Sequence, residues 1–417
     1  MSIGYACQVI GVPGTETSRC ILKNASEDNL RSLIHHNLNA LDAMLHYNIE
    51  NNIHFFRLSS DIIPFGSHPA NQLTWWEEFE EMFTALGEKI KNNNIRVSMH
   101  PGQYTVLNSP DSSTIANAIL DLEYHDRFLN ALGMDQTSKL VLHIGGVYGD
   151  KKEASRRFVE NYPLLSDSIR SRLILENDDK SYTVEDVLNI AYQTGSPVVF
   201  DNLHNAIKPS EANCTEQEWM LECKKTWKKV DGRQKIHYSQ QGKNSPVGGH
   251  SETVFLQPFE DFYPLVPLET DIMLEVKDKN LSANKCINTV FLNAKAVELE
   301  KEWARYKYFV LSRSARIYTE IRQLLKDKKE PVAREFYTRV EEAMLLPEDM
   351  GAEVNAAEHV WGYISKESTN AEKNRYQKLL KGYKENDNSI ATVKKHLFTC
   401  AVKRNLEYLL NSYYFYI

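Results

Sequence analysis

Short apolar runs rich in β-branched residues alternate with longer amphipathic stretches along most of the chain. The short runs have the length of buried strands, and the longer stretches repeat apolar residues at the three-and-four spacing of helices. The expected strands are residues 3–10, 53–60, 95–100, 139–144, 172–177, 197–201, 234–239 and 271–276. The expected helices between them include residues 27–50, 75–93, 114–132, 153–171 and 183–193. Alternating strands and helices predict an α/β fold, a (β/α)8 TIM barrel, whose chemistry lies where strands end in loops.

The last part of the chain has a different pattern. Residues 331–417 show helical periodicity alone, in segments such as REFYTRVEEAMLLP and KKHLFTCAVKRNLEYLL. We therefore expect a barrel domain over residues 1–300, a helical connector over residues 301–330 and an all-α domain over residues 331–417.

Ionisable side chains recur at the predicted strand ends. They are His100, His143, Glu176, Asp201, His237 and Glu275, with His204 shortly after Asp201, while predicted loops add His68 and His250. Each residue alone has an ordinary explanation, because a buried histidine is commonly a hydrogen-bonded core residue and a carboxylate often caps the next helix. Together at one rim, such groups would carry a steep desolvation cost unless cations compensated them. The pattern therefore predicts a metal site.

The number of candidate ligands exceeds what one ion needs, which indicates two or three ions with a shared carboxylate. Glu176 and Asp201 are the bridging candidates because their strands are adjacent. Mixed imidazole and carboxylate ligands favour Zn²⁺, Mn²⁺ or Fe²⁺ over Ca²⁺, and the residues alone do not distinguish among these three. Clustered metals suit phosphodiester hydrolysis, since one ion activates water and another stabilises the leaving oxygen.

The stretch SMHPGQYTVLNS places Gln103 and Tyr104 at a turn directly after His100. A polar and aromatic pair at a turn tip can stack on bases or separate them, although an ordinary loop is the alternative. Tyr5, in the first strand, is expected either to reach the barrel mouth or to fill the core. The basic stretch at residues 223–235 either follows phosphates or forms a solvated helix face.

Charge is unevenly distributed along the chain. The net charge is −7, but residues 301–417 hold 21 Lys and Arg against 16 Asp and Glu, a net charge of +5. An acidic first part is compatible with cation binding and a basic second part with a polyanion, although solvated surfaces produce the same asymmetry. Six cysteines without a CxxC pair suggest neither a zinc knuckle nor a disulfide framework. With no long apolar run or signal-peptide pattern, the protein is expected to be soluble and cytoplasmic.

In combination these motifs resemble the ultraviolet-damage DNA endonucleases, metal-dependent (β/α)8 nucleases distantly similar to endonuclease IV. The resemblance covers about residues 2–326 and is carried by IGYACQ, FRLSSDIIPFGSHP, SMHPGQYTVLNSP, LVLHIGG, LILEND, VVFDNLHN, KIHYSQQ, HSE and DIMLEVKDK. Within the last part, AEHVWGYISK and YKENDNS resemble a helical domain of unknown function found beside photolyases.

The resemblance implies a metal cluster of up to three ions built from His68, His100, His143, Glu176, Asp201, His204, His237, His250 and Glu275. Mn²⁺ is then the expected ion, with Zn²⁺, Mg²⁺ and Co²⁺ as alternatives, and no organic cofactor is expected. The resemblance also implies that Gln103 and Tyr104 enter damaged double-stranded DNA at the lesion, with Tyr5 nearby. Val9 departs from the family pattern, in which asparagine is frequent, and this puts one lesion-side polar contact in doubt.

The implied reaction is a nick on the 5′ side of cyclobutane pyrimidine dimers and (6-4) photoproducts, and in some members of abasic sites, by an enzyme expected to be a monomer. The expected catalytic residues are Glu176, Lys235 and His237. A protonated Lys235 cannot bind a metal ion, so we expect this lysine to be neutral or carboxylated. The alternative functions are a metal-dependent sugar isomerase or epimerase of the TIM-barrel class, and a damage sensor without activity.

Overall fold

The structure is a computed structural model that describes residues 1–326, 328 and 330–417. The chain forms two compact units, one of Met1–Val9 and Gly14–Asn284, the other of Ile10–Pro13 and Lys285–Ile417. The division falls before the expected boundary at residue 300. Residues just before 300 are tied to the second unit, since the Val332 and Ala333 amides donate to the Ala294 carbonyl at 3.0 and 3.1 Å. The described residues of the expected connector, 301–330, also fall in the second unit, where α12 (Glu300–Arg313) packs on later helices.

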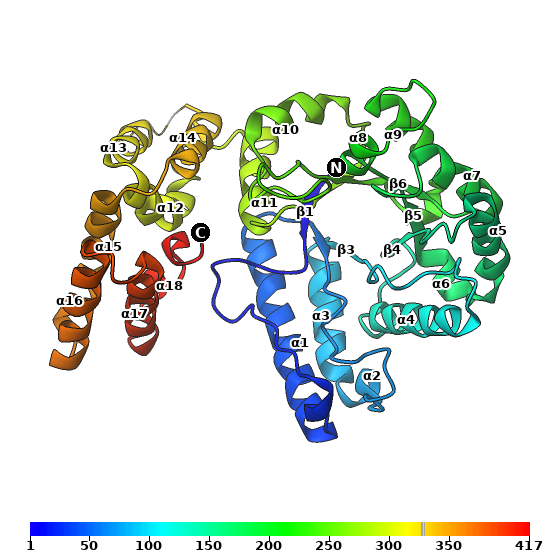
Figure 1. Ribbon diagram of the computed structural model, residues 1–417, viewed down its shortest axis with the longest axis horizontal. Coiled ribbons are helices and arrows are strands. Elements are labelled where there is room, and N and C mark those ends of the chain that lie inside the picture. Colours follow the sequence, from blue (N-terminus) through cyan, green and yellow to red (C-terminus); the bar gives the residue numbers. More distant parts are fainter. Residues whose placement is uncertain (327, 329) are drawn as a thin grey trace. The chain divides into compact units, whose positions relative to one another are not determined.

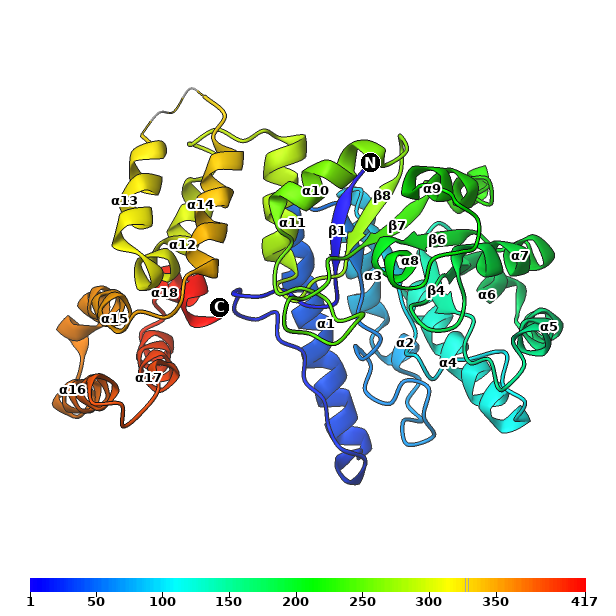
Figure 2. The same ribbon diagram turned by 45° about the horizontal axis from the view of Figure 1, so that its top comes forward.

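The first unit is a closed barrel of parallel strands within the described part of the chain, with helices on the outside (Figure 1). The strands are β1 (Ile3–Ala6), β2 (Phe55–Arg57), β3 (Arg96–Met99), β4 (Lys139–His143), β5 (Leu173–Glu176), β6 (Val198–Asp201), β7 (Lys235–Tyr238) and β8 (Asp271–Leu274). Each strand pairs with the next in sequence, and β8 returns to β1, which lies beside it in Figure 2. The predicted barrel and all its strands are confirmed, each strand being shorter than expected.

The barrel helices follow the strands and bury one apolar face each. They are α1 (Glu27–Glu50), α2 (Trp75–Glu78), α3 (Glu80–Asn92), α4 (Ser112–Ala131), α5 (Lys151–Asn161), α6 (Asp167–Arg172), α7 (Val184–Thr194), α8 (Asn202–Ile207), α9 (Glu216–Lys224), α10 (Leu256–Phe262) and α11 (Asn280–Cys286). The expected helix 75–93 is divided at Phe79, where φ is −114° and ψ is 24°. The expected helix 153–171 is divided near Pro163, whose ring nitrogen has no hydrogen to donate.

The amino ends of the strands are joined by buried ion pairs. The Arg96 guanidinium, at the start of β3, lies 2.9 Å from the Asp271 carboxylate at the start of β8. Lys139, the first residue of β4, donates to Asp231 at 2.5 Å. The first pair joins two strands that are not neighbours in the barrel, and the second joins β4 to the short 3-10 helix Lys229–Asp231 before β7. Both lie at the end of the barrel opposite the predicted chemistry.

The second unit is helical, as predicted for the end of the chain. Besides α12 it contains α13 (Ala315–Leu324), α14 (Ala333–Leu345), α15 (Met350–Ile364), α16 (Asn370–Lys384), α17 (Ile390–Lys403) and α18 (Glu407–Leu410). Its core includes Ala357, Val360, Val393 and Leu397, which lie on the facing sides of α15 and α17. Among the described residues, the structure contains no helix with the length and apolar character needed to span a membrane.

Candidate metal centre

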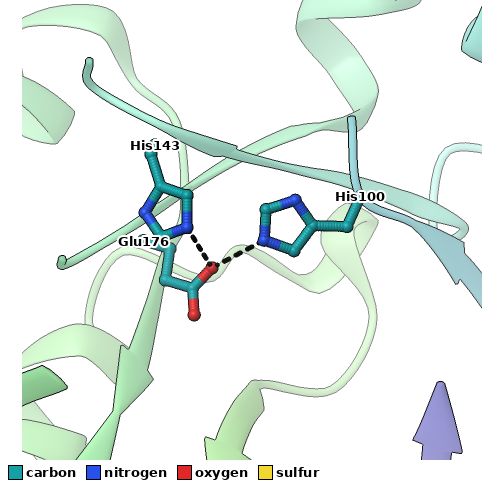
Figure 3. Close-up of side chains that lie close together, drawn as sticks. All are labelled: His100, His143 and Glu176. Atoms are coloured by element: carbon teal, nitrogen blue, oxygen red, sulfur yellow. Dashed lines mark hydrogen bonds and ion pairs between the residues drawn. The ribbon is translucent and has the colours of Figure 1, made fainter. Parts of the chain in front are cut away.

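Glu176 is the last residue of β5, and its side chain is fully buried among histidines from neighbouring strands. Its Oε2 atom lies 3.1 Å from His100 Nε2 and 3.4 Å from His143 Nε2 (Figure 3). Its Oε1 atom lies 2.6 Å from His237 Nδ1. The parallel register explains this convergence, because His143 pairs with Glu176 across β4 and β5 at the carboxyl ends of the strands.

A second group forms around Asp201, the last residue of β6. One oxygen, Oδ1, caps α8 by accepting a hydrogen bond from the His204 amide at 2.8 Å. This cap turns the chain so that His204 Nδ1 lies 3.7 Å from Asp201 and 3.9 Å from Glu176. The other oxygen, Asp201 Oδ2, is buried and has no hydrogen-bond partner among the described residues.

A third group contains Glu275, which directly follows β8. Its Oε1 lies 3.2 Å from His237 Nδ1, and its Oε2 lies 3.6 Å from His250 Nε2. Glu275 also forms an ion pair with Arg57, the last residue of β2. Arg57 is not among the residues expected from the sequence because an arginine does not bind metals, although its position at a strand end at the same rim is a usable signal.

These three groups share Glu176 and fit divalent cations. In each group, potential ligand atoms lie within 4.8 Å of one another: His100, His143 and Glu176; Glu176, Asp201 and His204; Glu176, His237 and Glu275. Asp201 Oδ2 is buried and has no hydrogen-bond partner among the described residues. Buried polar atoms are normally paired, so an unpaired carboxylate oxygen in one of these groups is what a metal ion would satisfy.

The electrostatics of the site favour metal ligation by most of these groups. Burial lowers the pKa of His100 to about 4, so its imidazole is neutral at pH 7 and has a lone pair to offer. Burial alone would raise the pKa of Glu275, but the adjacent charges of Arg57 and His237 together hold that pKa well below its usual range. Burial alone would lower the pKa of His204, but the charges of Asp201 and Glu176 raise it to about 9.

Comparison with known proteins identifies the family. A family model described as UV-endonuclease UvdE matches residues 12–295. The chain belongs to this family. A UvdE relative from Clostridium perfringens (strain 13 / Type A), named UV DNA damage endonuclease, is 40% identical over 387 residues, which cover 91% of this chain and 92% of the relative. One of the same name from Bacillus cereus (strain G9842) is 35% identical over 272 residues, covering 64% of this chain and 84% of the relative.

A solved structure and a second family model complete the comparison of this UvdE protein. The crystal structure of SacUVDE is 36% identical, with a TM-score of 0.66, and the match covers 70% of this chain and 98% of SacUVDE. Residues 307–417 match a model described as a protein of unknown function, DUF1722. The UvdE model therefore matches mainly the barrel unit, and the DUF1722 model matches the helical unit.

The expected catalytic lysine of this UvdE protein lies closer to the amino ends of the strands than the ligand groups do. Lys235, the first residue of β7, is buried, and its Nζ donates to Ser98 Oγ at 3.1 Å and lies 5.7 Å from the centre of the Phe55 ring. Burial and the nearby Arg57 charge lower the pKa of Lys235 well below its usual range. A neutral amine is the form that can react with carbon dioxide or share a proton with a neighbour.

Two expected site residues lie elsewhere in the structure. His68 is exposed, and its Nδ1 accepts a hydrogen bond from the Ala70 amide at 3.0 Å, so the structure does not bring it into the ligand groups. Tyr5 is fully buried, and its hydroxyl donates to Asn48 Oδ1 at 2.7 Å. Of the two positions considered for Tyr5, the structure therefore shows the one in the core.

Gln103 and Tyr104 are exposed in the turn after β3, on the same side of the barrel as the ligand groups. The Tyr104 ring is 70% exposed and lies over Gly102, where an added Cβ would come within 2.5 Å of the ring.

The basic stretch at residues 223–235 leads into the amino end of β7, and Trp227 Nε1 donates to the Val198 carbonyl at 2.8 Å. That stretch therefore lies at the barrel end opposite the ligand groups.

Proposed function

We propose that this protein is a repair endonuclease that hydrolyses the DNA backbone on the 5′ side of ultraviolet photoproducts with two or three divalent metal ions. The substrates are cyclobutane pyrimidine dimers and (6-4) photoproducts, with abasic sites as a further class. The observation that supports the proposal most directly is the convergence of three ligand groups on Glu176 within a UvdE barrel.

The residues that would hold the ions are those of the three groups, with His250 beside Glu275. Divalent ions held there would supply activation of a water molecule and compensation of negative charge on a phosphate. We assign the bridging position to Glu176, because each of its two oxygens faces a different set of imidazoles. Arg57 keeps Glu275 ionised and fixes its orientation, and Asp201 holds His204 in place through the α8 cap.

The exposed turn supports the assignment of the substrate. A flat aromatic ring and an amide that project beside the metal centre can replace the stacking lost when damaged bases leave the duplex. Gln103 and Tyr104 would take this part, while the ligand groups at the rim would act on the backbone of the strand to be cut. Mn²⁺ is the ion we expect from the family resemblance, because the ligand types alone do not distinguish Mn²⁺ from Zn²⁺ or Fe²⁺.

The experiment compares ultraviolet-irradiated and untreated supercoiled plasmid, incubated with the protein and Mn²⁺. We expect nicks that depend on irradiation and that disappear when EDTA is present. On a 5′-labelled duplex with one photoproduct at a known position, the labelled fragment should end on the 5′ side of the lesion. Binding to irradiated DNA without nicks would instead indicate a damage sensor, and epimerisation of a ketose without nicking would indicate a sugar-modifying enzyme.

A further inference from the structure

A groove with a volume of about 680 Å³ lies between α16 and α17 of the helical unit. One face of α17 and the first turns of α16 form it. Short side chains line it between long cationic ones. The lining residues are Ala371, Glu372, Arg375, Ala391, Thr392, Lys395, His396, Thr399, Cys400 and Lys403. The groove is hollow because alanine, threonine and cysteine side chains do not fill the space between the two helices.

Positive charge predominates in this α16–α17 groove. Its one acidic residue among the described lining residues, Glu372, is already paired with Arg404 at 2.6 Å and with Lys403 at 3.3 Å. Arg375 and Lys395 are exposed and have no ion-pair partner among the described residues. Burial lowers the pKa of His396, so this residue is uncharged at pH 7 and contributes no further charge. The groove therefore retains uncompensated cations that water alone solvates.

The spacing of the cations favours a polymer over a single anion. Lys395 and Lys403 are separated by eight residues of α17, which corresponds to about 12 Å along the helix. Two side chains that far apart do not readily converge on one phosphate, whereas successive phosphates of a nucleic acid recur every few ångströms. Residues 285–417 hold 23 Lys and Arg against 18 Asp and Glu, so the unit that carries the groove is basic in a protein with a net charge of −7.

We propose that the α16–α17 groove binds the phosphodiester backbone of DNA, independently of sequence and damage. The identity of the polymer rests on the proposed nuclease function, whereas the preference for a chain of phosphates rests on the groove itself. The groove holds undamaged DNA while the barrel acts on the lesion, and the helical unit thereby increases the time the enzyme spends on its substrate.

The test uses the full chain with Arg375, Lys395 and Lys403 all replaced by glutamine. The matched control replaces Lys366, Lys381 and Lys384, which are exposed cations of the same unit outside the groove lining. Affinity for an undamaged duplex is measured in EDTA at several salt concentrations, so the readout does not depend on cleavage. We expect the groove variant to bind about tenfold more weakly or worse, with a salt slope smaller by about 2 to 3, while the control keeps the wild-type slope.

An unchanged slope in the groove variant, or an equal loss in the control, would overturn the proposal, provided that both variants melt at the wild-type temperature. Displacement of the duplex by a mononucleotide would show a pocket for one phosphate and would also overturn it. Tighter groove-dependent binding of RNA than of DNA would refute the assigned polymer. Lesion-dependent nicking by the wild type is measured in parallel. If the wild type nicks DNA but the salt slope of the groove variant is unchanged, only the groove proposal is rejected. If the groove variant loses affinity but the wild type does not nick DNA, only the nuclease proposal is rejected.

Discussion

Glu176 is fully buried, negatively charged and in contact with several imidazoles. Burying such a charge costs free energy unless a cation compensates it. Burial opposes ionisation, yet the charges of His237 and His143 hold the pKa of Glu176 well below its usual range. The carboxylate therefore stays ionised at pH 7, and its two oxygens remain available as ligands. Replacing one oxygen by an amide nitrogen removes a ligand without changing the volume of the side chain.

We predict that Glu176→Gln lowers the rate of lesion-dependent nicking by about 100-fold or more, since loss of a charged group at a reacting centre commonly has effects of this size. Affinity for damaged duplex should stay within a few-fold of wild type, because the turn with Gln103 and Tyr104 is untouched. The rate is measured on irradiated plasmid, with Glu123→Gln, an exposed change on α4, as the control. Wild-type nicking by Glu176→Gln would refute the bridging assignment.

His204 gives the site a defined pH dependence. With a pKa raised to about 9 in the metal-free protein, this imidazole carries a proton at pH 7 that must leave before Nδ1 or Nε2 can bind an ion. Metal affinity should therefore rise as pH increases toward 9, by up to about tenfold per pH unit for one released proton. Calorimetric titration with Mn²⁺ in buffers of different ionisation enthalpy measures the released proton. His204→Gln should abolish that release, and a release unchanged in this variant would contradict the prediction.

At the scale of elements, the turn between β3 and α4 is where the barrel presents an aromatic ring to solvent. We predict that Tyr104→Ala weakens binding to damaged duplex by about 10-fold or more, since stacking on one base contributes roughly 1–3 kcal/mol. Tyr104→Phe should retain most of the affinity because it keeps the ring. Tyr192→Ala, which removes an exposed ring from α7, is the control. Equal effects of Tyr104→Ala and Tyr192→Ala would show that Tyr104 has no special part in binding.

Helices α4 and α6 are joined by a buried arginine. The Arg172 guanidinium donates to Asp126 at 2.8 Å and to Asn130 at 2.8 Å, both on α4, and to the Met134 carbonyl at 2.6 Å. Arg172→Met leaves the Asp126 charge buried without its partner, so we predict a loss of about 3–5 kcal/mol in the free energy of unfolding. Urea titration measures the loss. Arg170→Met, beside an exposed Asp167, should cost less than about 1 kcal/mol.

Much of the element order could be predicted because parallel barrel strands are buried on both faces and therefore appear as short continuous apolar runs. The interruptions within helices were harder to predict. Phe79 is not a residue type that ends helices, and Pro163 lies within an otherwise continuous amphipathic pattern. Six candidate ligands at strand ends could be predicted because barrel topology brings the carboxyl ends of the strands together. The orientation of Tyr5 could not be predicted, because the alternation of side chains along a strand does not say which face points into the barrel until the strand register is known.

At the scale of the whole molecule, metal removal should affect both activity and stability. The three ligand groups draw side chains from β3 to β8, so ions bound there connect most of the barrel. We predict that EDTA abolishes nicking and lowers the melting temperature, and that Mn²⁺ restores both, since a ligand that binds only the folded state stabilises it. Scanning calorimetry with and without Mn²⁺ measures the shift. An unchanged melting temperature at saturating Mn²⁺ would show that no ion binds the folded barrel.

The order of the strands also bears on how the protein is made. The three candidate ligand groups begin at His100 and end at Glu275, and the barrel closes only when β8 pairs with β1. A growing polypeptide on the ribosome therefore lacks a complete cluster until nearly the whole barrel has been synthesised. We therefore expect a nascent chain to gain the proposed nuclease activity only after β8 has been made, because Glu275 follows that strand and the barrel closes with it.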